Sequence, residues 1–153
     1  MELAALAQAD PRGARRPLRE PIARLAARLT PGRWLLTADD PQAFAVGLFA
    51  LAHANAIGVV PPNTRPGTLR ELGNGTRGRL VEGEPAAGSE VSLLQPKSGP
   101  AETLAPLDPE RPLLELFTSG STGHSQRVSK SLNHLAREVD ALESCFGGSL
   151  GDA

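Results

Sequence analysis

The stretch that most constrains the fold is residues 34–60, where a strand pattern, a helix pattern and a second strand pattern follow one another within 27 residues. Residues 34–37 and 57–60 are short apolar runs of the kind found in buried strands. A strand, a helix and a strand over this length form a βαβ unit, with parallel strands and a right-handed crossover. The sequence therefore predicts an α/β fold, with a mostly parallel sheet flanked by helices.

The helix between these strands is expected to run from Pro41 to about Asn55. Either Asp39 or Asp40 suits its N-cap, and proline suits its first position. Its longest apolar run, residues 43–52, has no polar face. A helix of this kind is buried on most sides, so we expect it to form part of the core.

Other elements are indicated along the chain. Helices are expected over residues 21–29, 66–72 and 132–146, and strands over residues 79–81, 91–94, 113–117 and around Val128. The segment 73–112 is rich in loop signals, and residues 96–112 are expected to form a surface loop. The last helix carries an apolar stripe, Leu132, Leu135, Val139, Leu142 and Phe146, which predicts packing in the core. The pair at residues 147–148, both glycine, is expected to end it.

Composition excludes several classes of function. The net charge is −1 and aromatic residues make up 3% of the 153 residues. These values disfavour partners such as nucleic acids or anionic membranes, and they leave few platforms for base stacking. No run of 18 apolar residues and no secretory signal is visible. We therefore expect no membrane span, and we expect a cytoplasmic location. The strong preference for arginine over lysine suggests a GC-rich bacterial genome.

Cysteine and histidine give no sign of a metal centre. Cys145 is the only cysteine. An intramolecular disulfide is therefore excluded, which suits a reducing compartment, and a buried or inert thiol is expected. His53 is expected to pack near the end of its helix and His134 to lie at the surface. No two histidines have ligand spacing with a third partner, so we predict no zinc site.

The residues that follow the expected strand at 113–117 are all small hydroxyl residues and glycines. They are Thr118, Ser119, Gly120, Ser121, Thr122 and Gly123. Glycine lets a ligand approach the backbone closely, and the hydroxyl groups add donors. Successive N–H groups in such a loop form a concave site for anions, of which phosphate is the expected one. The segment is neither a Walker A loop nor a nucleophile elbow, and the alternative is a plain flexible turn between two strands.

This TSGSTG segment resembles the phosphate-binding loop of the AMP-forming acyl-CoA synthetases, a branch of the adenylate-forming ligase superfamily. The family loop usually continues with proline and lysine, whereas this chain has Ser125 and Gln126. Lys130 is expected to replace the missing cation at the phosphates. The resemblance extends over about residues 34–148, and the spacing after Lys130 is similar to that of proteins from aryl-polyene and xanthomonadin pigment clusters.

The resemblance implies that residues 1–153 form a partial N-terminal AMP-binding domain, with its phosphate loop at 118–123. The implied parent is an ATP-dependent acyl- or aryl-CoA synthetase. It would join a carboxylic acid to AMP and then transfer the acyl group to coenzyme A or a carrier thiol. The implied task of the loop is to hold the β- and γ-phosphates of ATP together with Mg²⁺.

Other family motifs have no counterpart in this sequence, so no catalytic residue is assigned. The chain is interpreted as an N-terminal fragment of a ligase that is inactive alone and associates as a homodimer or aggregates. The alternative is a non-catalytic α/β binding or assembly module that retains a relic phosphate loop. The difference at Gln126 favours this alternative, and the intact TSGSTG favours the ligase.

Overall fold

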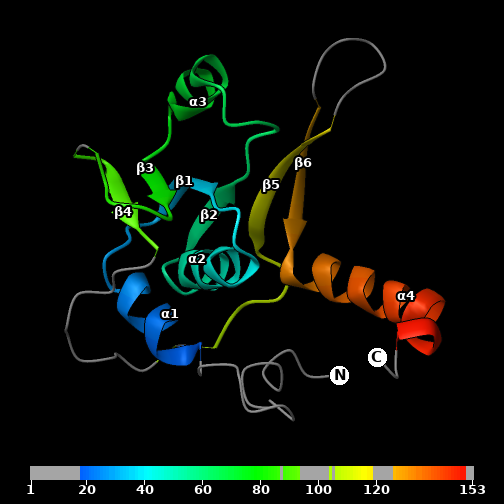
Figure 1. Cartoon of the computed structure of the whole chain (residues 1–153). Helices are drawn as coiled ribbons and strands as arrows, with labels where there is room; N and C mark the ends of the chain where they lie inside the picture. The colour runs from blue at the N-terminus through cyan, green and yellow to red at the C-terminus, as the bar shows by residue number, and fades with distance from the viewer. Residues whose placement is uncertain (1–17, 87, 94–103, 105, 119–125, 151–153) are drawn as a thin grey trace.

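The computed structural model describes residues 18–86, 88–93, 104, 106–118 and 126–150, and within them the chain forms one six-stranded sheet (Figure 1). Every strand pair is parallel except β5–β6, which is antiparallel. The predicted α/β fold with a mostly parallel sheet is confirmed. In the order β4-β3-β1-β2-β5-β6, the strands are Glu90–Ser92, Gly78–Val81, Gly32–Thr37, Ala56–Val59, Pro112–Thr118 and Gln126–Ser131.

The βαβ unit consists of β1, helix α2 (Pro41–His53) and β2, as predicted. Of the two candidate caps, the helix uses Asp40, whose carboxylate accepts hydrogen bonds from the backbone N–H groups of Gln42 and Ala43 at 3.2 and 3.4 Å. The helix ends earlier than expected, because Asn55 has a φ of +56°. This left-handed conformation, which asparagine tolerates, turns the chain directly into β2.

One face of the sheet is covered by α2, and α1 (Arg19–Ala26) packs against α2 on the same side (Figure 1). The helix lies close to the sheet: a Cβ added at Gly47 would lie 2.7 Å from a methyl carbon of Leu36. Leu51 and Leu36 are 0% and 1% exposed. The expectation that α2 is buried on most sides is therefore confirmed.

The opposite face of the sheet is covered more thinly. Helix α3 (Pro66–Gly73) lies on this side, but it has no buried residue (Figure 1). Several strand positions on this face carry charges: Arg33 donates to a carboxylate oxygen of Glu115 at 3.1 and 2.6 Å, and Arg79 pairs with Glu90. Parallel sheets are usually apolar on both faces, so the ionic character of this face is unusual.

Helix α4 (Leu132–Leu150) begins at a reciprocal cap. The backbone N–H of His134 donates to the Ser131 hydroxyl at 3.3 Å, and the N–H of Ser131 donates to Nδ1 of His134 at 3.2 Å. The arrangement matches a capping box in which histidine replaces glutamate. His134 is exposed, as predicted, and its function is to start the helix.

The prediction that the whole apolar stripe of α4 packs in the core is wrong. Its first members do contact the core, but Val139, Leu142 and Phe146 are 39%, 59% and 56% exposed. The reason is geometric: α4 starts at the edge strand β6 and extends away from the sheet (Figure 1). Cys145 on the same helix is exposed, so of the expected buried or inert thiol the buried alternative is wrong, and the inert one stays a prediction.

Two boundaries differ from those predicted. The helix α4 continues to Leu150 through the glycines expected to end it. In the segment 73–112, strands β3 and β4 occur where short strands were expected, while residues 87, 94–103 and 105 lie outside the described residues. Among the helices of the described residues, none is both long enough and apolar enough to cross a membrane.

Candidate functional site

The predicted phosphate loop follows the carboxyl end of β5. Thr118, its first residue, is the last residue of β5 and faces Gln126, the first residue of β6. The hydroxyl of Thr118 donates to the carbonyl oxygen of Gln126 at 3.4 Å. Since β5 runs parallel to β2, its carboxyl end lies at the edge where open α/β sheets bind their ligands.

The other predicted members of this loop lie outside the described residues. They are Ser119, Gly120, Ser121, Thr122 and Gly123. The assignment of residues 118–123 to phosphate binding therefore stays a prediction. The structure does describe the hairpin of β5 and β6, which holds the two ends of this segment together.

Lys130 is not brought together with Thr118. It lies opposite Leu114 in β6, four residues along the strand from Gln126, which corresponds to about 13 Å. Its ammonium group pairs with the carboxylate of Glu138 on α4. A contact with phosphate would require the lysine to leave Glu138, so its role at the phosphates also stays a prediction.

Arg127 is a second cation beside the loop, and the sequence analysis did not consider it. It directly follows Gln126 in β6, and its side chain is 58% exposed. Its guanidinium lies 3.9 Å from the carboxylate of Glu115, which is already held by Arg33. Its position next to Gln126, where the family has lysine, is the signal that would have drawn attention to it.

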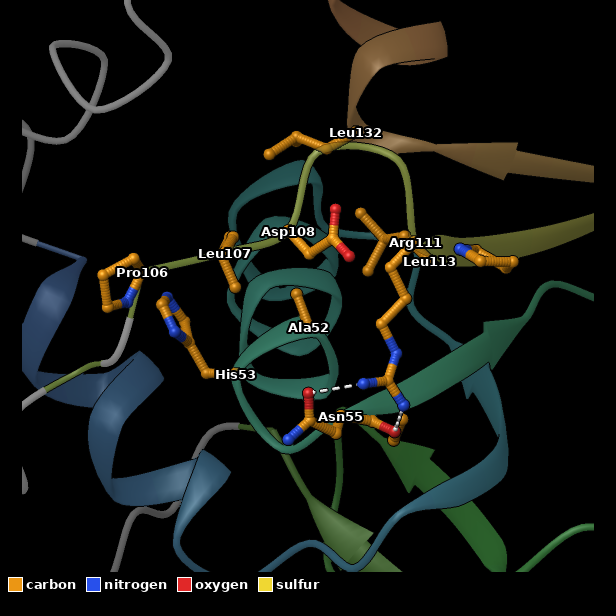
Figure 2. A pocket seen from close by; sticks show the side chains of 11 residues that line it. Ala52, His53, Asn55, Pro106, Leu107, Asp108, Arg111, Leu113 and Leu132 are labelled. Atoms are coloured by element: carbon orange, nitrogen blue, oxygen red, sulfur yellow. Dashed lines mark hydrogen bonds between the residues drawn. The ribbon is translucent and has the colours of Figure 1, made fainter.

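A cavity of about 150 Å³ lies at the opposite end of β5, where the strand begins (Figure 2). Its polar lining includes His53, Asn55, Asp108 and Arg111. The guanidinium of Arg111 donates to the side-chain oxygen of Asn55 at 2.7 Å and to its backbone carbonyl oxygen at 2.9 Å. Because both terminal nitrogens are used in this way, we interpret the pair as a clamp that holds the start of β5 against the end of α2.

Replacing Arg111 with alanine is expected to lower the free energy of unfolding by about 1 kcal/mol, because two charge-assisted hydrogen bonds at a solvent-accessible site are lost. Urea unfolding followed by circular dichroism measures the change. Arg137→Ala, at an exposed position on α4, is the control and should unfold at the wild-type midpoint. Equal midpoints for the two variants would show that the clamp adds no stability.

Comparison by sequence finds no matching family pattern and no matching curated protein. Comparison by structure finds similar folds. The N-terminal subdomain of Klebsiella oxytoca NpsA, in complex with 3-hydroxyanthranilyl-AMSN, has a TM-score of 0.62 and 22% identity and covers 79% of this chain and 34% of that one. E. coli MenE with bound OSB-AMS has a TM-score of 0.61 and 24% identity and covers 83% of this chain and 31% of that one.

A third structure, the AMPPNP-bound form of the nonribosomal peptide synthetase FmoA3, has a TM-score of 0.66 and 15% identity, and covers 86% of this chain and 16% of that one. These neighbours are adenylate-forming enzymes, and the chain has the fold of their N-terminal part. It spans about a third of the length of the NpsA N-terminal subdomain and of MenE, and less of FmoA3.

Proposed function

We propose that this chain is the N-terminal part of an ATP-dependent, AMP-forming ligase that joins a carboxylic acid to a thiol. The observation that carries the proposal is the position of the TSGSTG segment, which begins at Thr118 at the carboxyl end of β5. The fold is shared with adenylate-forming enzymes whose structures contain AMPPNP or ligands named as AMS and AMSN compounds.

The proposed chemistry has two halves. A carboxylate oxygen attacks the α-phosphorus of ATP, the bond to the β-phosphate oxygen breaks, and pyrophosphate leaves. A thiol, either coenzyme A or a carrier, then attacks the acyl carbon and releases AMP. Residues 118–123 are proposed to hold the β- and γ-phosphates with preorganised N–H and hydroxyl donors, which stabilise the charge that develops on the leaving group.

Magnesium is proposed to enter with ATP. Among the described residues, no three His, Cys, Asp or Glu side chains form a group that could hold a metal ion. Magnesium commonly keeps several waters and binds through substrate phosphates, which fits this lack of a preformed protein site. The part of this chain would be to position the phosphates to which the ion is bound.

A narrower proposal is that the ligase is of the type found in aryl-polyene and xanthomonadin pigment clusters. The spacing of Lys130, Glu138 and Phe146 supports it. The competing proposal is a non-catalytic module with a relic loop, which is favoured by Gln126 at the position where the family has lysine. Under either proposal, ligase or non-catalytic module, the protein is cytoplasmic.

Pyrophosphate release tests the proposal, measured with ATP and a panel of fatty and aryl acids. The 153-residue chain alone is expected to stay at background. Its loop would contact only the phosphates, whereas holding two reactants in line is worth roughly 7–11 kcal/mol and needs groups for both. A longer protein that contains this chain is expected to release pyrophosphate with at least one acid.

Two results would contradict the proposal. Turnover by the 153-residue chain would mean that it is not a fragment of a larger active site. A longer protein that binds neither ATP nor any acid would favour the non-catalytic module. ATP binding by the longer protein, measured by calorimetry, separates an inactive binding module from a ligase that lacks its proper acid.

A further inference from the structure

A second cavity, of about 330 Å³, lies on the thinly covered face of the sheet, between α3 and the strands β3 and β4. Arginine side chains from three places in the chain line it: Arg70 on α3, Arg77 just before β3, and Arg79 in β3. This cavity does not adjoin β5, the strand that ends at Thr118, where the predicted phosphate loop begins. In the sheet order, β1 and β2 separate β3 from β5, a lateral distance of about 14 Å.

The charges of this cavity do not cancel. Glu90 pairs with Arg79, and the backbone N–H of Ala86 donates to the other carboxylate oxygen at 2.8 Å. That N–H, followed by the guanidinium, holds the pKa of Glu90 below its ordinary value, so Glu90 is charged at neutral pH. Arg70 and Arg77 form no ion pair with any residue that the structure describes, which leaves two positive charges uncompensated.

The backbones of the two unpaired arginines have defined positions in the fold. Arg70 lies in the last turn of α3. The backbone N–H of Arg77 donates to the carbonyl oxygen of Arg33 at 2.7 Å. The stem of Arg77 also packs against Gly32, since a Cβ added there would lie 2.9 Å from Cγ of Arg77. The guanidinium groups therefore start from defined positions, which lowers the cost of ordering them around a ligand.

The same cavity has an apolar part. Leu35, which is 4% exposed, and the half-buried Leu69 both line it. Guanidinium groups recognise phosphate with paired hydrogen bonds, and leucine side chains accept an apolar group next to that phosphate. We propose that the cavity binds a small phosphate monoester whose organic group contacts these leucines while Arg70 and Arg77 bind its phosphate.

Phenyl phosphate is the probe for a calorimetric titration of the 153-residue chain. Saturable binding is expected, with weaker binding of inorganic phosphate and none of phenol, because each lacks one half of the ligand. The double variant Arg70→Ala with Arg77→Ala is expected to bind phenyl phosphate at least 10-fold more weakly, about 1.4 kcal/mol. Arg65→Ala, an exposed arginine just before α3, is the matched control and should bind like the wild type.

Failure of phenyl phosphate to bind the wild type would overturn the proposal, as would equal binding by the double variant. Circular dichroism checks that the double variant is folded. If it is not, the single variants Arg70→Gln and Arg77→Gln must each weaken binding, and unchanged affinities would refute the site. A variant with valine at Gly120 and Gly123 is expected to keep the affinity for phenyl phosphate, and a loss would assign the probe to the loop.

Discussion

Valine at both Gly120 and Gly123, introduced into the longer adenylating protein proposed above, is expected to lower the rate of pyrophosphate release by about 100-fold or more. A branched side chain at either position would keep the phosphates away from the backbone N–H groups. It would also disfavour the positive φ values that such loops use. Thermal stability should change little, because the segment connects the two strands of a hairpin and the pairing of these strands is left intact.

The control for this experiment is Gly83→Val. A Cβ at Gly83 meets no atom within 4 Å, so the substitution adds the same bulk at a harmless position. Its pyrophosphate release should equal that of the wild type. If the loop variant also releases pyrophosphate at the wild-type rate, residues 118–123 are a plain turn and the proposed function loses its main support.

Gly78→Ala is expected to lower the free energy of unfolding by about 3 kcal/mol, through forced overpacking. A Cβ at this position would lie 2.0 Å from the carbonyl oxygen of Ser89 and 2.8 Å from a ring carbon of Trp34. The first contact is with backbone, and that same carbonyl accepts a hydrogen bond from the N–H of Arg79 at 2.9 Å. Relief therefore requires β3 and β4 to separate. Urea unfolding followed by tryptophan fluorescence, from the single Trp34, reports the change.

Gly67→Ala is the matched control, since a Cβ there meets nothing within 4 Å and the residue lies in α3. Alanine in a helix is better than glycine by about 0.5–1 kcal/mol, so this variant should be slightly more stable than the wild type. A Gly78→Ala protein that unfolds at the wild-type midpoint would show that the edge strand β4 moves away at no cost.

The features that the sequence predicted well are local ones. The βαβ unit follows from two apolar runs and from the aspartate and proline that start α2, all of which act within a few residues. Pairs formed across the sheet could not be predicted in this way. Arg33 and Glu115 are 82 positions apart, and only the sheet order brings β1 and β5 near enough for their ion pair.

The same distinction between local patterns and long-range contacts holds for the candidate site. The TSGSTG segment is a contiguous pattern, so its position after β5 was predictable. The partner of Lys130 was not, because Glu138 meets it only where β6 turns into α4. The cavity lined by Arg70 and Arg77 was missed for a related reason: its arginines are spaced irregularly, and only the packing of α3 on β1, the neighbour of β3, assembles them.

The exposed apolar stripe of α4 has a thermodynamic consequence. Val139, Leu142 and Phe146 offer apolar surface that folded chains can bury against one another. Unfolded chains lack this ordered stripe, so self-association would draw the equilibrium toward the folded state by mass action. The melting temperature of this protein should therefore rise with its own concentration, in contrast to that of a strictly monomeric domain.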